Sequence, residues 1–336
     1  MRARLIANPQ AGPDRARAYL PLITAKIRTL VDDLDVTLST SVEDTQRAAA
    51  CAVEEGCDAL YIAGGDGTLN AALQGLTAGG QRSEARGPET PIVQLPIGII
   101  PLGTGNDFAK ALGLGEEPEA ALDALLECRV LDTDLGLVND RPFVNTSAGG
   151  FIADVSESVT ETLKNAAGKL AYLVAGARAL IGTEPFSTSI TIHDDRVHGA
   201  APAEIRLRER LGGQVDVQLF AVCNARFIGG GYPIAPDALI DDGLLDVLIA
   251  RKLPLLEFLA VLQRLATGQH RDDPAVTHFR AASFDLEFDR TIRVNTDGEV
   301  LEAGRCEYRV RPRAARFFCG PSPQSNRKPG TWNQER

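Results

Sequence analysis

The first 130 or so residues alternate short apolar runs with stretches whose apolar positions recur at helical spacing. Bounded apolar runs of about four to eight residues are typical of buried strands, and 3.6-residue spacing predicts helices. Strand and helix in repeated alternation indicate a parallel sheet covered on both faces. Predicted strands cover residues 4–7, 35–39, 59–63 and 97–100, and predicted helices cover 16–31, 43–55, 69–76, 108–112 and 119–128.

From about Asp132 the pattern changes to strands joined by tight turns, such as the one expected at Asn139 and Asp140. Strands at such close spacing predict a β-rich second domain. Residues 320–336 are rich in Pro, Ser, Asn and Gln, a composition that predicts disorder. The predicted strands cover 135–138, 143–146, 188–193, 204–207, 215–222, 245–250, 284–288 and 291–295, with helical stretches at 155–181 and 255–267.

We therefore predict an α/β plus β protein. A doubly wound α/β domain is expected over residues 1–131, and a β-sandwich over residues 132–305. The helical stretch 155–181 gathers its apolar side chains near one face. That face can lie on lipid or cover the sandwich core, and core packing is the better expectation.

Two glycine loops carry the candidate chemistry of the first domain. One is Gly64-Gly65-Asp66-Gly67-Thr68, and the other is Gly103-Thr104-Gly105-Asn106-Asp107. Each follows an apolar run and opens a helical pattern, so free backbone N–H groups and a helix N-terminus can face an anion. Each also contains an aspartate, and a carboxylate beside phosphate needs a cation such as Mg²⁺. The pair predicts a Mg-nucleotide site, although the first loop alone is also compatible with a plain strand-to-helix turn.

Composition narrows the class of protein. The chain has 336 residues, 44% of them hydrophobic, which is enough for two globular domains. Its formal net charge of −10 argues against nucleic acid as a partner, because such proteins normally present excess Lys and Arg. The six cysteines form no CxxC pair, so we expect neither a zinc site nor a disulfide framework. No signal peptide and no apolar run of spanning length is recognised, which predicts a cytoplasmic protein.

Several motifs together carry a family resemblance. The sequences GGDGTLN at 64–70, PLGTGNDF at 101–108 and NTSAGGF at 145–151 resemble the diacylglycerol kinase catalytic-domain family, with bacterial soluble lipid kinases as the nearest look-alikes. GGDGT alone is shared with NAD kinases and phosphofructokinases. The likeness spans roughly residues 1–318. Further matching segments are Asn8-Pro9-x-x-Gly12, Asp134-Leu135-Gly136, Asp241 to Asp246, and Asp297-Gly298-Glu299.

The resemblance implies a fold and an activity. It implies an N-terminal ATP-binding domain like that of NAD kinases and phosphofructokinases, a C-terminal β-sandwich, and a cleft between them. It also implies that residues of about 306–319 return to the first domain. The expected reaction moves the γ-phosphate of Mg-ATP to the hydroxyl of a membrane lipid. Diacylglycerol is the leading candidate for this lipid, and sphingoid bases, ceramide and phosphatidylglycerol stay open as alternatives. Peripheral contact with the inner membrane surface is implied, and a homodimer stays open.

The resemblance also assigns roles to residues. Asp66, Asp107 and Asp134 match a network around the catalytic Mg²⁺, Asp297 matches the general base, and Glu299 supports it. A second, structural Mg²⁺ is implied at Asp242, the Leu244 carbonyl and, less firmly, Asp246. The nucleotide is expected at Asn8, Gly12, Gly64, Gly65, Gly67, Thr68, Asn70, Gly103, Thr104, Gly105 and Asn106.

Local readings of three of these sites remain open. Asn106 or Asp107 can simply cap the helix that follows it. Asp297 and Gly298 follow an alternating strand and can form a hairpin turn. Asp241 to Asp246 can be a polar turn before a buried strand.

Two positions depart from the pattern of many relatives. Pro13 and Ala175 stand where basic residues are common, so phosphate neutralisation is expected to fall to Lys110, Lys169 or Arg178. The departures keep two rivals open. One is a NAD kinase-like or sugar-phosphate kinase, and the other is a nucleotide- or lipid-binding regulator that has lost catalysis.

Overall fold

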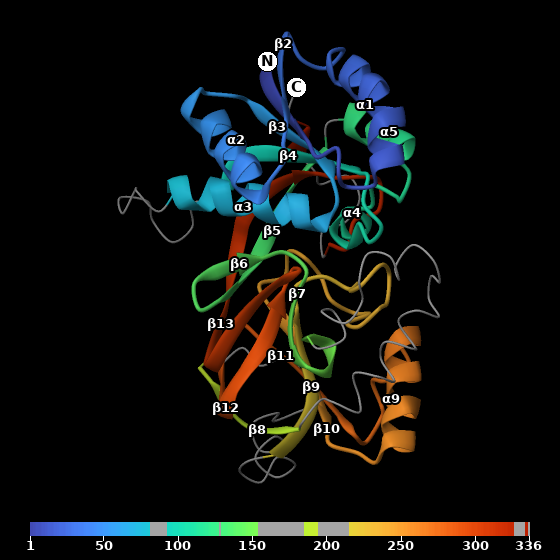
Figure 1. Cartoon of the computed structure of the whole chain (residues 1–336), viewed down its shortest axis with the longest axis vertical. Coiled ribbons are helices and arrows are strands. Elements are labelled where there is room, and N and C mark those ends of the chain that lie inside the picture. The colour runs from blue at the N-terminus through green and yellow to red at the C-terminus, as the bar shows by residue number, and fades with distance from the viewer. Residues whose placement is uncertain (81–92, 128, 154–184, 194–214, 326–332, 335–336) are drawn as a thin grey trace.

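The computed structural model describes residues 1–80, 93–127, 129–153, 185–193, 215–325 and 333–334. These residues form two lobes, one above the other along the long axis of the molecule (Figure 1). We call them the N-terminal lobe and the β-rich lobe. A single hydrogen-bonded sheet, 14-stranded in the described residues, runs through both. It is continuous because β13 (Glu299–Phe318) passes from the β-rich lobe into the N-terminal lobe.

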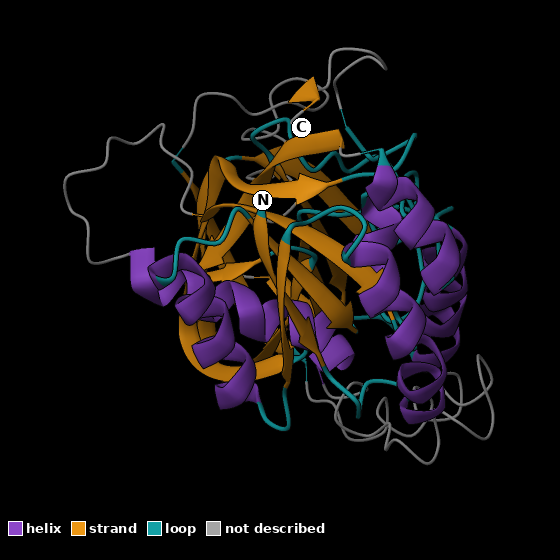
Figure 2. Cartoon of the chain, turned by 90° about the horizontal axis from the view of Figure 1, so that it is seen from above, coloured by secondary structure: helices purple, strands orange, loops and turns teal. Residues whose placement is uncertain are grey.

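The N-terminal lobe has the predicted doubly wound arrangement. Its strands run parallel in the order β4–β3–β1–β2. Helices α2 and α3 lie on one side of the strands and α1 and α5 on the other, so both faces are covered (Figures 1 and 2). The elements are β1 (Arg2–Ala7), α1 (Pro13–Ile27), β2 (Asp33–Leu38), α2 (Val42–Glu54), β3 (Ala59–Gly64), α3 (Asp66–Gly80), β4 (Val93–Pro101), α4 (Asp107–Ala111) and α5 (Pro118–Leu126).

The end of β13 belongs to the core of this lobe. Ala315 and Phe317 pair in parallel with β4. The Phe317 ring meets Phe108 edge to face at 4.9 Å, and Phe318 stacks on Tyr61 at 5.8 Å between ring centroids. Aromatic burial of this kind is among the largest single contributions to a core. The end of β13 is thereby fixed to the lobe that contains the first strand of the chain.

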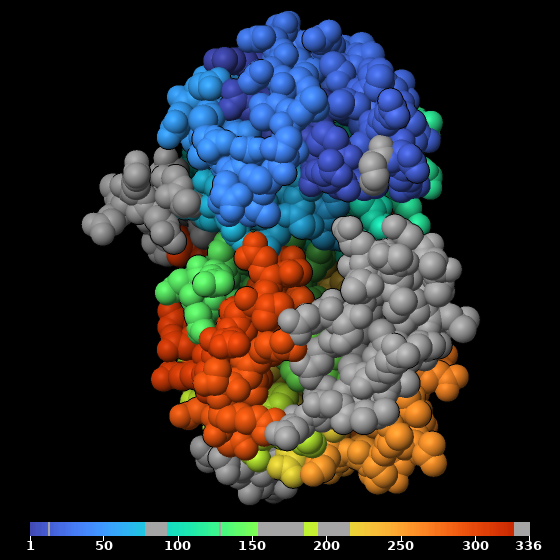
Figure 3. Space-filling view, in the orientation of Figure 1, coloured from blue at the N-terminus to red at the C-terminus, as the bar shows by residue number. Residues whose placement is uncertain are grey.

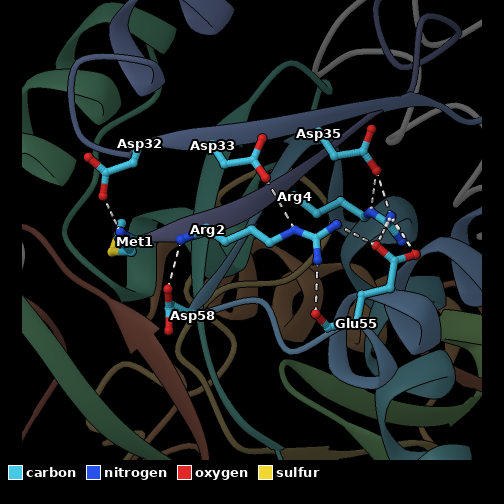
Figure 4. A network of polar contacts seen from close by, with 8 residues as sticks. All are labelled: Met1, Arg2, Arg4, Asp32, Asp33, Asp35, Glu55 and Asp58. Carbon is cyan, nitrogen blue, oxygen red and sulfur yellow. Dashed lines mark hydrogen bonds and ion pairs between the residues drawn. The ribbon is translucent and has the colours of Figure 1, made fainter.

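Strand β1 also carries a network of charged side chains (Figure 4). Arg4 is only 6% exposed, which is tolerable because its guanidinium contacts the carboxylates of Asp35 and Glu55 and the Ala48 carbonyl. Arg2 bonds to the same Glu55 carboxylate. The network lies at the amino end of β1. It therefore stabilises the end of the sheet opposite to the end at which the glycine loops lie.

The β-rich lobe is built around strands buried on both faces. In β9, Phe220 and Val222 face the sandwich core, whereas Leu219 and Ala221 pack toward Phe258 of α9. This alternation gives one strand two apolar layers. The elements are β5 (Arg129–Val138), β6 (Arg141–Phe143), β7 (Thr146–Gly150), β8 (Phe186–Ile192), β9 (Val215–Cys223), β10 (Leu245–Arg251), α9 (Leu255–Thr267), β11 (Val276–Ala281) and β12 (Ser283–Thr296).

Some sequence predictions differ from the observed elements. The predicted strands 284–288 and 291–295 are one strand, β12, with a register shift between Glu287 and Ile292. Strand β11 had not been predicted. The stretches 155–181 and 204–207 lie outside the described residues. None of the helices in the described ranges is long and apolar enough to cross a bilayer.

The segment after β13 is packed at its start. Gln324 is 6% exposed, donates its backbone N–H to the Ala111 carbonyl at 2.8 Å, and accepts the Ile240 N–H at 2.9 Å. Gly320 donates to the Leu112 carbonyl at 2.9 Å. Residues 320–325 are therefore ordered by contacts to both lobes, where composition had predicted disorder. Farther on, β14 (Asn333–Gln334) pairs with β5.

Candidate active site

The two glycine loops touch each other at the carboxyl ends of β3 and β4. The Leu102 N–H donates to the Gly64 carbonyl at 2.9 Å. A Cβ placed on Gly103 would lie 2.7 Å from the Cα of Gly65, so any side chain there would force the loops apart. The predicted adjacency of the two loops is what the structure shows.

Asp66, the first residue of α3, reaches across to the second loop. Its two carboxylate oxygens accept the N–H groups of Asp107 at 3.1 Å and Phe108 at 3.2 Å. Asp66 thus caps α4 from another element. Asn106 instead folds its amide back onto both backbone groups of Gly103. Neither Asn106 nor Asp107 caps the helix, so this local alternative is not observed.

Asp107 is 5% exposed and faces the other lobe. Its Oδ2 accepts the N–H of Gly230 at 3.0 Å, from the loop after β9. Its Oδ1 has no hydrogen-bond partner among the described residues, and the Nζ of Lys110 is 3.8 Å away. Burial raises the pKa of Asp107 to about 6, and the charge of Asp66 adds to the rise. An acceptor oxygen is therefore held in a buried position with its bonding capacity unused.

Asp297 is at once a hairpin residue and an inward-facing carboxylate. Thr296 pairs with Glu299, so Asp297 and Gly298 form a two-residue turn between β12 and β13. Their φ angles of 46° and 93° are those of the left-handed region that such turns require. The hairpin that the sequence offered as a local alternative is therefore observed, and the catalytic role of Asp297 stays a prediction.

The Asp297 carboxylate sits in a cradle of backbone donors. It accepts N–H groups from Val144 at 2.7 Å, Thr146 at 2.9 Å and Asn145 at 3.2 Å. Burial raises the pKa of Asp297 to about 6; the three N–H bonds oppose that rise, and the charge of Asp66 adds to it. A carboxyl group whose pKa lies just below neutral pH is suited to accepting a proton.

Asn145 connects the two lobes at this point. Its Nδ2 lies 3.5 Å from Oδ1 of Asp66, and its own Oδ1 has no hydrogen-bond partner in the described part of the chain. Asn224, 1% exposed, accounts for the position of this segment. It donates its side-chain amide to the Val144 carbonyl at 2.9 Å and its backbone N–H to the Asn145 carbonyl at 2.8 Å.

Sequence reasoning missed these supporting residues. Asn145 stood in a quoted motif but was given no role. No local pattern marked Asn224 or Gly230, because their function depends on contacts with residues distant in the sequence. Glu299 faces α3, where its Oε1 accepts the side-chain amide of Gln74 at 2.8 Å. Gln74 was missed as well.

The residues predicted to bind nucleotide gather around the same loops. Asn8, just after β1, donates its side-chain amide to Thr68 Oγ1 at 3.1 Å. A Cβ on Gly12 would lie 2.4 Å from the Leu102 carbonyl, which places the first loop of the chain against the second glycine loop. Asn70 is 3% exposed, and its Oδ1 lacks a partner within the described ranges. Gly67 and Thr104 are exposed, and Lys169, Ala175 and Arg178 lie outside the described residues.

Asp134 is placed differently from the other predicted catalytic residues. It is fully buried on β5, and its carboxylate accepts the N–H groups of Gly243 at 2.6 Å and Arg313 at 2.8 Å. Burial raises its pKa to about 6, with Asp242 and Asp241 adding to the rise. Arg313 has a φ of 51° at the register shift between β13 and β5. The Asp134 carboxylate therefore stabilises the backbone of β13 at the register shift, where the strand passes from one lobe into the other.

The predicted metal residues Asp242, Leu244 and Asp246 contact other groups of the protein. The Arg280 guanidinium, from β11, contacts the carboxylates of Asp242 and Asp246, and His278 Nε2 lies 3.2 Å from Asp246. The Leu244 N–H donates to Asp242 at 3.1 Å. The described residues contain no group of three His, Cys, Asp or Glu that could hold a metal by themselves. A metal at this position stays a prediction.

Two family sequence models match the chain and together cover most of it. Residues 2–138 match the diacylglycerol kinase catalytic domain. Residues 146–319 match the YegS C-terminal NAD kinase beta sandwich-like domain. The two matches meet within the segment that carries β5, β6 and the Asp297 cradle. They agree with the α/β plus β-sandwich fold.

Whole-chain relatives agree with the family models. The chain is 30% identical over 298 residues to a diacylglycerol kinase of Staphylococcus saprophyticus, covering 89% of this chain and 88% of that protein. It is 28% identical to a probable YegS-like lipid kinase of Shewanella frigidimarina, covering 88% and 89%. A crystal structure of a putative diacylglycerol kinase from Bacillus anthracis superposes with a TM-score of 0.74 at 24% identity, covering 95% of each chain.

Proposed function

The chain belongs to the diacylglycerol kinase family of lipid kinases, and on that premise we propose that it transfers the γ-phosphoryl group of ATP to the hydroxyl of diacylglycerol, giving phosphatidic acid. One observation carries the proposal. Asp66 of the N-terminal lobe lies beside Asp107, and Asn145 connects Asp66 to Asp297 of the β-rich lobe: its side-chain amide is 3.5 Å from Asp66, and its backbone N–H is 3.2 Å from Asp297. Donor and acceptor substrates can therefore be held by different lobes and brought together between them.

The residues present fit a magnesium–nucleotide complex. Mg²⁺ prefers oxygen ligands and usually takes one or two carboxylates, with phosphate oxygens and waters completing its shell. The buried Oδ1 atoms of Asp107 and Asn145 have no hydrogen-bond partner in the described residues, and Asp66 lies beside both. We propose that Asp66 and Asp107 hold the ion. When bound, it would neutralise charge that develops on the transferred phosphoryl group.

The glycine loops would hold the phosphates of the nucleotide. Their backbone follows strands β3 and β4 directly, and α3 begins at Asp66, so a helix N-terminus lies in the first loop. The first N–H groups of α4 are bonded to Asp66, so the second loop would act through the residues before Asp107. Lys110 lies beside Asp107 at 3.8 Å, with a side chain 13% exposed. We propose that Lys110 supplies positive charge where many relatives use a residue at position 13.

Asp297 would act as the general base toward the lipid hydroxyl. Its pKa of about 6 leaves it largely ionised at neutral pH, and three backbone N–H groups fix its orientation. The proton of the hydroxyl would move to a carboxylate oxygen as the oxygen attacks phosphorus. The names of the relatives point to diacylglycerol; ceramide, sphingoid bases and phosphatidylglycerol present hydroxyls of similar chemistry. The substrate lies in membrane, so we also propose peripheral contact with the bilayer.

The proposal is tested with labelled ATP, Mg²⁺ and mixed micelles that contain each of the four lipids separately. We expect labelled phosphatidic acid from diacylglycerol, and turnover lower by about 10²–10⁴ in Asp297→Asn with ATP binding retained. Asp140→Asn is the matched control, because Asp140 is an exposed aspartate in another two-residue hairpin with positive φ. Wild-type turnover in Asp297→Asn would reject the base. NAD and a sugar phosphate are added in parallel reactions as acceptors; labelled NADP or labelled sugar bisphosphate without labelled lipid would reject a lipid substrate, and ATP binding without any transfer would indicate a regulator.

A further inference from the structure

A relay of three polar side chains crosses from the N-terminal lobe to the tip of the β12–β13 hairpin. Gln46 on α2 donates its Nε2 to Gln74 Oε1 at 2.7 Å. Gln74 on α3 in turn donates its Nε2 to Glu299 Oε1 at 2.8 Å. All three residues are half-buried. The relay therefore ends at Glu299, two residues from Asp297, the proposed base.

The direction of the relay is fixed at one end. An ionised carboxylate only accepts hydrogen bonds, whereas a glutamine amide has a donor end and an acceptor end. Gln74 must therefore turn its Nε2 toward Glu299, which leaves its Oε1 for Gln46. Both amides are oriented by this single requirement, and each holds the next in a defined rotamer. Glu299 therefore accepts its hydrogen bond from a donor that is already oriented.

Close packing of α2 on α3 makes the relay possible. A Cβ placed on Gly75 would lie only 2.1 Å from the Gln46 carbonyl oxygen. Glycine at this position lets the two helix backbones approach so far that the Gln46 side chain can reach Gln74. The start of α2 is fixed separately, because Ser41 Oγ accepts the Asp44 N–H at 3.1 Å. The first donor of the relay is therefore held by secondary structure, and not by a loop.

Helix α3 ties the relay to the reacting groups. It begins at Asp66 and reaches Gln74 two turns, or about 12 Å, farther along. At one end it presents the carboxylate proposed to hold the cation, and two turns later it holds the hairpin that carries Asp297. The tip of the hairpin rests against the N-terminal lobe (Figure 3). A shift of Gln74 would therefore change the placement of Asp297 relative to Asp66.

We infer that Gln74 is a positioning residue, oriented by Gln46, whose bond to Glu299 sets the placement of the Asp297 turn for phosphoryl transfer. The inference rests on the proposed function for its catalytic part. Its structural part, the dependence of Glu299 on the orientation of Gln74, stands on the hydrogen bonds alone.

The sharpest test reverses the polarity of the relay at its far end. In Gln46→Glu, position 46 offers only acceptors, so Gln74 must turn its Nε2 toward it and present Oε1 to the Glu299 carboxylate. We expect kcat to fall about tenfold, since one hydrogen bond to a charged group becomes a repulsive contact. KM for ATP should change less than about twofold, because the glycine loops are untouched. Gln263→Glu, on the exposed face of α9, is the matched control for the added charge and should match wild type.

A second variant restores the relay in the opposite direction. In Gln46→Glu combined with Glu299→Gln, the new amide at 299 can donate to Gln74 Oε1, and Gln74 Nε2 can donate to the new carboxylate at 46. We expect the melting temperature lost in Gln46→Glu to be regained in the double variant, although residues 46 and 299 do not touch. The two changes should therefore be non-additive in stability. This readout does not depend on activity.

The outcomes separate the two proposals. Additive effects on melting temperature would overturn the relay, whatever the activity. Coupling in stability together with unchanged kcat in Gln46→Glu would overturn the positioning role. If wild type phosphorylates no lipid, the proposed function fails and the catalytic part of the inference fails with it. A fall in kcat with KM retained, accompanied by coupling, supports both.

Discussion

Two groups of buried and half-buried carboxylates differ in what faces them. We call Asp66, Asp107 and Asp297 the cleft group, and Asp134, Asp242 and Asp246 the junction group. In the junction group, backbone N–H groups and the Arg280 guanidinium face the carboxylates. In the cleft group, Asp107 keeps an oxygen with no hydrogen-bond partner among the described residues.

The comparison shows that a shifted pKa alone does not identify the site. Burial raises the pKa of both Asp107 and Asp134 to about 6. The Asp134 carboxylate already serves two backbone donors, so its cost is compensated within the fold. Asp107 is faced by the N–H groups of Gly230 and Gly231 and by a lysine at 3.8 Å, yet its Oδ1 has no hydrogen-bond partner among the described residues. Unused acceptor capacity at Asp107, and not the pKa, is the observation that supports the proposed cation site.

The largest expected effect comes from Asp107→Asn. We expect turnover to fall by about 10²–10³, because a preorganised charge at the transferred phosphoryl group is lost. Stability at pH 7 should stay equal or rise, since the variant removes a buried charge beside Asp66. The measurements are kcat with saturating ATP and the melting temperature. A clear drop in melting temperature would place Asp107 with the junction group.

The same variant has a pH signature of defined sign. The pKa of Asp107 is raised from 3.8 to about 6, so its contribution to stability is fully present below pH 3.8 and is lost as pH rises through about 6. Asp107→Asn does not titrate there. Its stability should therefore fall less than that of wild type between pH 4 and 7, when both are followed by urea unfolding.

The next effect concerns Arg280, the internal cation of the junction group. Arg280→Met leaves the Asp242 and Asp246 carboxylates without their guanidinium, and we expect a loss of about 2–4 kcal/mol at pH 7. Burial already raises the pKa of Asp242, and Arg280 opposes that rise. Without Arg280 the pKa rises further, so the deficit should be largest at neutral pH and shrink as pH falls toward 3.8.

The Arg280 experiment also tests the metal predicted at Asp242, Leu244 and Asp246. If the guanidinium is the cation of this site, Mg²⁺ without nucleotide should not change the melting temperature of wild type through these residues. If Mg²⁺ raises the melting temperature, and Asp242→Asn abolishes that rise but Asp107→Asn does not, the predicted metal site at Asp242, Leu244 and Asp246 is supported. That result would also contradict the role given to Arg280.

Prediction from sequence succeeded where the signal is local. Helix α9 spans Leu255–Thr267, as its apolar spacing predicted, and β3 follows its apolar run. Short motifs carry Asp66, Asp107 and Asp297, so the sequence could name these residues, and their catalytic roles stay predictions. Helix and strand periods, and glycine turns, are readable over a few neighbouring residues, and these features needed nothing more.

The remaining features depend on contacts between distant residues. Strand β13 runs for 20 residues through both lobes, but no apolar period in the sequence indicates this length. Its backbone at Arg313 is held by Asp134, a residue distant in the sequence. Strand β11 had no strand signal, since Arg280 within it points to carboxylates on the Asp242 loop and on β10. Gln74 and Asn224 act on partners more than 70 residues away. Their roles follow from how the lobes meet.

The smallest expected effect tests the junction group at Asp134. Asp134→Ala leaves the N–H groups of Gly243 and Arg313 without their acceptor, and we expect a loss of about 1–3 kcal/mol. Asp107→Ala is the matched control, because it releases the N–H of Gly230 and removes a charge beside Asp66. Asp134→Ala should therefore cost more stability than its control and less turnover at a temperature where both are folded. If Asp107→Ala instead costs more stability and Asp134→Ala costs more turnover, Asp134 belongs to the catalytic network that its sequence motif implied. In that case the bend in β13 does not depend on the Asp134 carboxylate.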